Sequence, residues 1–211
     1  MGLDIYFYKI DKKYADYPMN TLSETINADA KKKFAKKCDK WLKTLGDTPT
    51  KGYDQAYHNI VGELGKDPMF KRYGFYLDRL KQDKLNFGQL KEWLDSEART
   101  YYQVSDCYFR KVNFLYAFFR EYMEDECCLV EPCLIDSLIE VCEDVLAHHK
   151  NDADGGVEFA RLNLPTQSGF FFGGIEYDGW YWSDVQDCLK QMKKLRKSLK
   201  DGDKVYGVFS W

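Results

Sequence analysis

Polar and aromatic side chains that could bind a ligand are concentrated in one stretch, residues 164–182, which reads LPTQSGFFFGGIEYDGWYW. Aromatic faces stack on planar ligands, while hydroxyl, amide and carboxylate groups bind a ligand's polar edge. If the stretch folds back on itself, both kinds of side chain converge on one pocket. The candidate ligand-binding residues are Thr166, Gln167, Ser168, Glu176, Tyr177, Asp178 and Trp180.

The same polar residues also have a purely structural interpretation. Thr166 and Ser168 could close a turn, and Glu176 and Asp178 could accept hydrogen bonds from backbone amides. Polar side chains in glycine-rich segments mostly support the local backbone, so the sequence favours this second interpretation.

Three consecutive phenylalanines, Phe170 to Phe172, lie in the middle of the stretch. Their apolar area is too large for a surface loop to leave in water, so they must be buried or face a partner. Gly169, Gly173 and Gly174 allow the backbone to turn or to approach another segment closely. We predict that the three rings lie against the interior and fix the neighbouring polar side chains.

Cysteine and histidine side chains have the residue types of a zinc site but not its spacing. Cys127, Cys128 and Cys133 precede His148 and His149, with no CxxC pair among them. About fifteen helical residues place the histidines roughly 20 Å from Cys133. We therefore predict no metal site and no cofactor. Seven cysteines, an odd number, favour reduced buried thiols over a disulfide framework.

Groups for catalysis are scarce. The chain has three histidines and no GxSxG, P-loop, GxGxxG or HExxH motif. Glu176 with Asp178 could shuttle a proton, but two acids alone do not define an active site. We assign no catalytic residue, and the sequence leans against an enzyme without deciding the question.

A band of acidic residues suggests a binding site of another kind. Residues 121–158 carry twelve acidic side chains and one lysine. On the helix predicted to begin at Pro132, the acids lie largely away from the apolar stripe, where they could present a negative ridge to a basic partner. We define this acidic ridge as Asp136, Glu140, Glu143 and Asp144. A solvated helix face is the simpler alternative.

The overall charge gives little reason to expect a polyanionic partner. The net charge is −3, so the whole chain has no general attraction to nucleic acid or anionic membranes. The seven lysines of residues 31–43 are read as a solvated face. No apolar run is long enough to span a membrane, and the opening MGLDIYFYKI lacks the pattern of a signal peptide. We expect a cytoplasmic protein with no membrane association and no direct contact with nucleic acid; its oligomeric state is open.

Apolar periodicity predicts an α+β fold. Strands are predicted at 3–10 and 204–211, as neighbours in a small antiparallel sheet, and residues 127–130 are predicted as either a short strand or an extended link. Helices are predicted at 27–45 with Asn27 as cap, at 53–64, at 67–80, and from Pro132 to a polar loop at 151–156. A capping box of Ser183 and Gln186 begins the last helix. A long central aromatic helix runs from 90 to 123. We predict a single domain, 1–211, with an inserted basic helical lobe at about 27–84.

Three blocks of the chain resemble a family of small proteins found in phages and prophages. The blocks are the opening MGLDIYF, YFRKVNFLYAFF at 108–119, and LPTQSGFFFGGIEYDGWYWSD at 164–184. Members begin MGLDMY, carry a YWRK-type helix and contain LPTxSGFFFG followed by EYDEWY. The lysine-rich region 31–86 does not resemble typical members. Where members often have Glu, this chain has Gly179, so a role that needs that carboxylate does not carry over.

The family has no assigned activity, so the resemblance implies a biological context and no mechanism. We expect a non-catalytic protein-binding module of a phage or mobile element, directed at a host or defence protein in the bacterial cytoplasm. The alternative is a small-ligand or nucleotide-binding protein, with or without hydrolase activity, whose site lies in residues 164–182.

Overall fold

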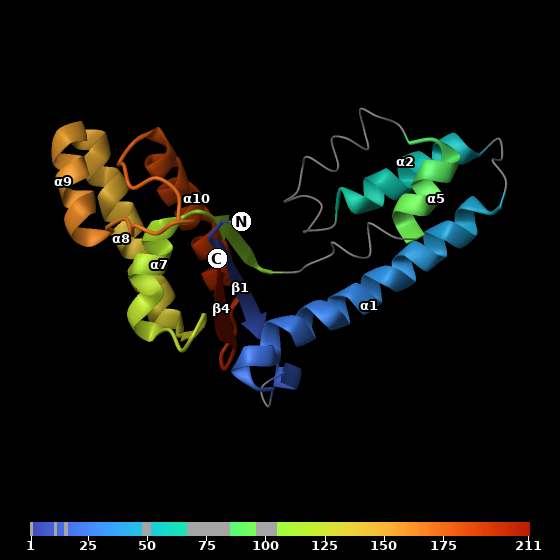
Figure 1. The fold of residues 1–211 in the computed structure, drawn as a ribbon, viewed down its shortest axis with the longest axis horizontal. Coiled ribbons are helices and arrows are strands. Elements are labelled where there is room, and N and C mark those ends of the chain that lie inside the picture. The colour runs from blue at the N-terminus through green and yellow to red at the C-terminus, as the bar shows by residue number, and fades with distance from the viewer. Residues whose placement is uncertain (1, 11, 15–16, 48–51, 67–84, 96–104) are drawn as a thin grey trace. The chain divides into compact units, whose positions relative to one another are not determined.

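The computed structural model describes residues 2–10, 12–14, 17–47, 52–66, 85–95 and 105–211 (Figure 1). The chain forms two compact units: a sheet unit of residues 1–20 and 105–211, and a helical unit of residues 21–104. The helical unit therefore interrupts the sheet unit in the sequence. The basic lobe predicted at about 27–84 falls within it, and the helix predicted at 67–80 lies outside the described residues.

The centre of the sheet unit is a four-stranded antiparallel sheet with strand order β2-β1-β4-β3. Its strands are β1 (Asp4–Ile10), β2 (Cys107–Arg110), β3 (Cys127–Val130) and β4 (Lys204–Ser210). The two central strands, β1 and β4, pair with Ile5 opposite Phe209 and Phe7 opposite Gly207. The predicted α+β fold, with the first and last strands as neighbours, is confirmed.

Alternation along β1 directs one set of side chains into the main core. Leu3, Ile5 and Phe7 are fully buried there. The Phe7 ring packs against Phe119 at 5.3 Å and against Phe209 at 6.1 Å between ring centroids. Opposite Phe7, a Cβ atom on Gly207 would lie 2.9 Å from the Cys128 sulfur, so this position accepts only glycine.

Four helices complete the sheet unit (Figure 1): α7 (Asn113–Phe119), α8 (Pro132–Asn151), α9 (Ala153–Asn163) and α10 (Gly179–Ser198). Pro132 stands in the first turn of α8, where its missing N–H is harmless. The apolar stripes of α8 and α10 join the sheet in one core. Their buried residues are Ile135, Leu138, Cys142 and Val145 on α8, and Tyr181, Trp182, Val185, Cys188, Met192 and Leu195 on α10.

The expected long central helix is wrong. The segment around Tyr108 is strand β2, and α7 has only seven residues. Cys107 and Phe109 alternate into the core from a strand paired with β1, and Lys111 then takes φ 60°, which ends the strand. The alternation of buried and exposed side chains covers only four residues, and aromatic residues on both sides of them match a helical spacing. Pairing with β1 overrode this local helical pattern.

Two helix boundaries also differ from the prediction. Helix α10 begins at Gly179 instead of Ser183, because the Asp178 carboxylate accepts hydrogen bonds from the Trp180 and Tyr181 amides. The expected loop at 151–156 is largely the start of α9, which is capped by Asp152. Gly156 is helical and buried. A Cβ atom there would meet the His149 backbone at 2.4 Å, so α9 can approach α8 this closely only with glycine at this position.

The helical unit contains α1 (Met19–Leu45), α2 (Tyr53–Leu64) and α5 (Phe87–Asp95). Helix α2 matches its predicted bounds, whereas α1 begins at Met19, so Asn27 lies inside the helix and is not its cap. The three helices share a separate apolar core. Its buried residues are Phe34, Cys38, Trp41, Leu45, Tyr57, Ile60, Val61, Leu64, Leu90 and Leu94. At its border, the Trp41 indole N–H donates to Glu63 at 3.0 Å.

A side chain of α10 protects one outer edge of the sheet. The Gln191 amide accepts from the Tyr108 N–H and donates to the Tyr108 carbonyl, both at 3.2 Å. These are edge groups of β2 that would otherwise be open to pairing with another chain. Gln191 therefore stops the sheet at β2 and fixes the strand that carries Arg110.

Candidate functional site: the aromatic loop

The connection between α9 and α10 folds as a loop anchored by one buried ring. We call residues 164–180, which are this connection and the first two residues of α10, the aromatic loop. Phe172 is 7% exposed, and its ring packs against Tyr116 at 4.7 Å and against Trp211 at 5.7 Å. Phe172 is therefore the apolar anchor of the loop in the main core.

A buried amide holds the loop backbone just beyond this anchor. Asn113 is 3% exposed and is the one buried polar residue in the described part of the chain. Its side-chain nitrogen donates to the Gly174 carbonyl at 2.6 Å and lies 3.5 Å from the Phe172 carbonyl. Between these two carbonyls Gly173 takes φ 94°, a conformation that favours glycine. The amide thus satisfies backbone groups that a tight turn leaves without partners.

Further hydrogen bonds close both ends of the loop. The Leu3 N–H donates to the Phe171 carbonyl at 3.0 Å, which joins the loop to the start of β1. The Thr166 hydroxyl donates to the Ile175 carbonyl at 3.0 Å, across the loop. The buried Tyr181 hydroxyl donates to the Leu164 carbonyl at 2.9 Å. Burial raises the pKa of Tyr181, so this hydroxyl keeps its proton and remains a donor.

The braced loop presents large apolar side chains to solvent. Phe170 is 95% exposed, Trp180 is 80% exposed and Ile175 is 48% exposed. Phe171 is half-buried and meets Phe170 edge to face at 4.8 Å. The prediction that all three phenylalanine rings lie inward is therefore wrong for Phe170 and correct for Phe172. The backbone turns within the triplet, where the Phe172 N–H donates to the Gly169 carbonyl at 3.1 Å, so neighbouring rings cannot all face one core.

A cavity of about 450 Å³ lies beside the loop, and Trp180 is the one exposed aromatic among its lining residues. Four of the predicted ligand-binding residues line it: Thr166, Glu176, Asp178 and Trp180. The other three lie elsewhere. Gln167 accepts a hydrogen bond from Arg120 at 3.3 Å, Ser168 is exposed, and the Tyr177 hydroxyl accepts from the Thr166 N–H at 3.2 Å.

The carboxylates of the loop bind its own backbone. Glu176 accepts from the Ile175 N–H at 3.0 Å, and Asp178 accepts from the first amides of α10 at 2.9 and 3.2 Å. Together with the Thr166 hydroxyl, these are the contacts of the structural interpretation given above. In each of these two carboxylates, the second oxygen accepts no hydrogen bond from an N–H group of the described residues.

Sequence reasoning missed the charged residues on the other wall of the cavity. Arg110 and Lys111 follow directly after the buried part of β2, and Asp184 comes from α10. A Cβ atom on Gly173 would lie 3.2 Å from the Lys111 carbonyl and Cβ, so the loop crosses this point closely. The two cations were missed because the segment was expected to be helical, which would have placed them away from the loop.

Asp184, like Tyr181, lines the cavity and has a pKa that its surroundings displace strongly. Burial, followed by the negative charges of Asp187 and Asp178, raises its pKa to about 6. Arg110 and Lys111 line the same cavity, but neither makes an ion pair with it in the described structure. Asp184 therefore gains its full negative charge only above that pH.

The acidic ridge on α8 is partly neutralised within the chain. Asp136 binds the Arg196 guanidinium through two hydrogen bonds of 2.8 and 3.1 Å, and Glu143 forms an ion pair with Lys193. Both bases belong to α10, so these acids join two helices of the sheet unit. Glu140 and Asp144 remain exposed, and their role in binding a partner stays a prediction.

Five of the seven cysteines are buried, whereas Cys127 is half-buried and Cys133 is exposed. No disulfide joins them, and the described residues contain no group of three or more ligands suited to a metal ion. His148 stacks on Phe159 and His149 stacks on Trp182, each at 3.7 Å between ring centroids. The two histidines thus pack α8 against α9 and α10.

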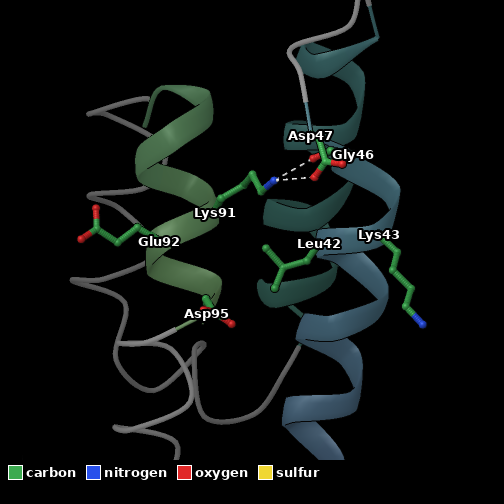
Figure 2. A pocket seen from close by; sticks show the side chains of 7 residues that line it. All are labelled: Leu42, Lys43, Gly46, Asp47, Lys91, Glu92 and Asp95. Carbon is green, nitrogen blue, oxygen red and sulfur yellow. Dashed lines mark hydrogen bonds and ion pairs between the residues drawn. The ribbon is translucent and has the colours of Figure 1, made fainter.

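A second cavity, of about 580 Å³, lies in the helical unit between α1 and α5. Figure 2 shows Lys91 reaching the end of α1, where its ammonium donates to the Gly46 carbonyl at 2.9 Å and lies 3.5 Å from Asp47. A cation at this position stabilises the negative end of the helix dipole. Lys43 and Glu92 point away from Lys91, so the charged groups do not converge and we assign no site here.

In comparisons with known proteins, no family model matches the chain, and no curated protein or solved structure matches it significantly. The resemblance to phage and prophage proteins therefore stays a prediction. None of the described helices is long and apolar enough to cross a membrane.

Substitution by alanine should change the free energy of unfolding much more at the buried Phe172 than at the exposed Phe170. We expect Phe172→Ala to lower the free energy of unfolding by about 3 kcal/mol, because it removes a buried ring and leaves a cavity. Phe170→Ala, the matched control, should change it by less than about 0.5 kcal/mol. Urea unfolding followed by circular dichroism measures both. Equal effects would contradict the arrangement of the loop.

Asp184 should make stability depend on pH. Its pKa is higher in the folded protein, so its contribution is fully present below about pH 4 and is lost as pH rises through about 6. Asp184→Asn cannot ionise, so its stability relative to the wild type should increase across that window. Urea unfolding of both proteins from pH 4 to 8 measures the difference. A constant difference would show that the carboxylate is not displaced.

Proposed function

We propose that this chain is a non-catalytic protein-binding module whose contact surface is the aromatic loop. The observation that carries the proposal is the exposure of Phe170 and Trp180, at 95% and 80%, on a loop held by buried contacts. Phe170 is in contact with Phe171, and exposed apolar surface of this kind commonly marks an interaction site. Tryptophan is enriched among the residues that dominate binding energy.

The bracing of the loop supports binding over accidental exposure. A loop fixed by the Asn113 amide and the Phe172 ring loses little conformational entropy when a partner covers it. Phe170 and Phe171 lie against each other edge to face, so the displayed surface is partly ordered before binding. Such preorganisation raises affinity without additional contacts.

The biological context follows from the resemblance described above. The LPTQSGFFFGGIEYDGWYW stretch contains the aromatic loop and is one of the three blocks that resemble phage and prophage proteins. A module of this kind in a phage or mobile element would act on a host or defence protein in the bacterial cytoplasm. The acidic ridge is the weaker candidate surface, since Asp136 and Glu143 already bind cations of α10.

A second function is favoured by the cavity under the loop. Arg110 and Lys111 on one wall and Trp180 on another could bind the phosphate and the ring of a small planar anion, such as a nucleotide. The acids Glu176, Asp178 and Asp184 oppose an anion, so this function ranks second. The residues that line the cavity include no histidine, cysteine or serine, and we assign no catalytic group.

The first proposal is tested by capture from a host lysate followed by measurement with the purified partner. Wild-type protein should retain a partner that the Phe170→Ala, Trp180→Ala double variant loses. Each single change should weaken the measured affinity by roughly tenfold or more, as expected for central interface aromatics. Both side chains are exposed, so the variants should keep the wild-type melting temperature to within a few degrees.

Tyr122→Ala is the matched control, because Tyr122 is a surface aromatic of the same unit with 54% exposure. Its substitution should leave partner binding unchanged. Loss of the partner with Tyr122→Ala, or its full retention by the double variant, would reject the aromatic loop as the contact surface. Weakening by Glu140→Lys instead would assign binding to the acidic ridge.

A further inference from the structure

The exposed side of α1 carries a row of lysines. Residues 31–43 contain seven lysines and one acidic residue, Asp39. The helix packs its other side, including Phe34 and Cys38, into the core of the helical unit. All seven lysines are exposed to solvent.

Helical geometry places most of these lysines on one narrow face. At 3.6 residues per turn, five of them fall within about 100° of the circumference, opposite the buried stripe. We call this set the lysine face: Lys32, Lys33, Lys36, Lys40 and Lys43. It extends about 16 Å along the axis, at 1.5 Å per residue. The charges therefore form a line and not a cluster.

This arrangement works against the stability of the helix. Lys32 and Lys36, and again Lys36 and Lys40, are spaced four residues apart, where like charges repel. Lys33 has a carboxylate partner, Asp29, at 3.3 Å. In the described structure, Lys32, Lys36, Lys40 and Lys43 make no ion pair. Lysines that repel one another and have no carboxylate partner within the chain are expected where an anion from outside the chain neutralises them.

Charge is also segregated between the two units. The helical unit carries 16 basic and 12 acidic residues, whereas the sheet unit carries 15 basic and 22 acidic residues. The net charge of −3 thus combines a positive helical unit with a negative sheet unit. Whole-chain charge gave no reason to expect a polyanion, but the helical unit considered alone does.

We propose that the lysine face binds the phosphate backbone of double-stranded nucleic acid, without sequence preference. Lysine is a flexible point charge that pairs well with phosphate, and contacts to phosphate carry no sequence information. No exposed aromatic stands among residues 31–44, so the face lacks the stacking surface that single strands use. The apolar side of α1 is already buried and cannot insert into a membrane, which argues against lipid as the source of the phosphate.

The probe is a fluorescein-labelled 20-base-pair DNA duplex of arbitrary sequence, titrated with the full-length protein at several salt concentrations. Binding should weaken as salt rises, since each neutralised phosphate contributes about 0.9 to the slope of log affinity against log salt. Lys32→Gln, Lys36→Gln, Lys40→Gln in one variant should make the slope shallower by about 3 and lower affinity at low salt by roughly tenfold or more.

The matched control replaces three exposed lysines of α10 in the sheet unit: Lys190→Gln, Lys194→Gln and Lys197→Gln. This control changes the net charge by the same amount as the α1 variant. It should leave the slope of log affinity against log salt nearly unchanged. The α1 variant should melt no lower than the wild type, because it removes repulsion and glutamine is a good helix former.

Three outcomes would overturn the proposal. The first is no binding of the duplex by wild-type protein at about 50 mM salt, where backbone contacts are strong. The second is equal weakening by both triple variants, which would indicate general electrostatics. The third is equal or tighter binding of poly-glutamate or of phosphatidylserine vesicles through the same lysines, which would indicate an acidic protein or a membrane as the partner.

Discussion

The buried amide of Asn113 is the interaction on which the candidate site depends. It stands at the start of α7, directly after the close approach of Lys111 to the loop, and it binds the backbone at Gly174. A backbone carbonyl buried without a donor would destabilise this turn by about 1–3 kcal/mol. The amide therefore permits an irregular loop to lie on the core at a point where no regular element could supply the hydrogen bonds.

This constraint explains how one short segment can be both anchored and exposed. Phe172 contributes the apolar contact, Asn113 and Leu3 bind the backbone on either side of it, and the chain then has no freedom to bury Phe170 as well. A hydrophobic ring that stays in water because its neighbours are fixed is available to a partner at little ordering cost. Trp180, in the first turn of α10, lines a charged cavity, so apolar and charged groups lie next to each other there.

The sequence was informative wherever local pattern and tertiary context agree. Apolar and polar residues alternate in the two terminal strands, and the apolar residues from Tyr57 to Leu64 repeat at helical spacing. Strands β1 and β4 and helix α2 could therefore be predicted. The segment at Cys107 could not, because its strand is four residues long and its identity depends on pairing with β1, which is about a hundred residues away. The start of α10 was misplaced because Asp178 provides an earlier cap than Ser183, and α9, which Asp152 caps, begins where a loop was expected.

For the site, the sequence identified the right stretch but not the direction of each side chain. Residue type indicates that phenylalanine rings tend to be buried, but the turn after Gly169 determines which of the three is buried. Arg110 and Lys111 could not be assigned to the loop, because their approach to Gly173 is a contact between distant segments. The lysine face of α1 was visible as composition, and its meaning changed once the helix and the charge of its unit were defined.

The most direct test is residue-resolved hydrogen exchange of the aromatic loop in the wild type and in Asn113→Leu, a substitution of similar size that cannot donate. The amides of Thr166 and Phe172, bound to Tyr177 and to the Gly169 carbonyl, should exchange slowly in the wild type. In Asn113→Leu they should lose protection while the paired amides of β1 and β4 keep theirs. Rapid exchange of these loop amides in the wild type, or protection unaffected by the substitution, would contradict a braced loop and the binding surface built on it.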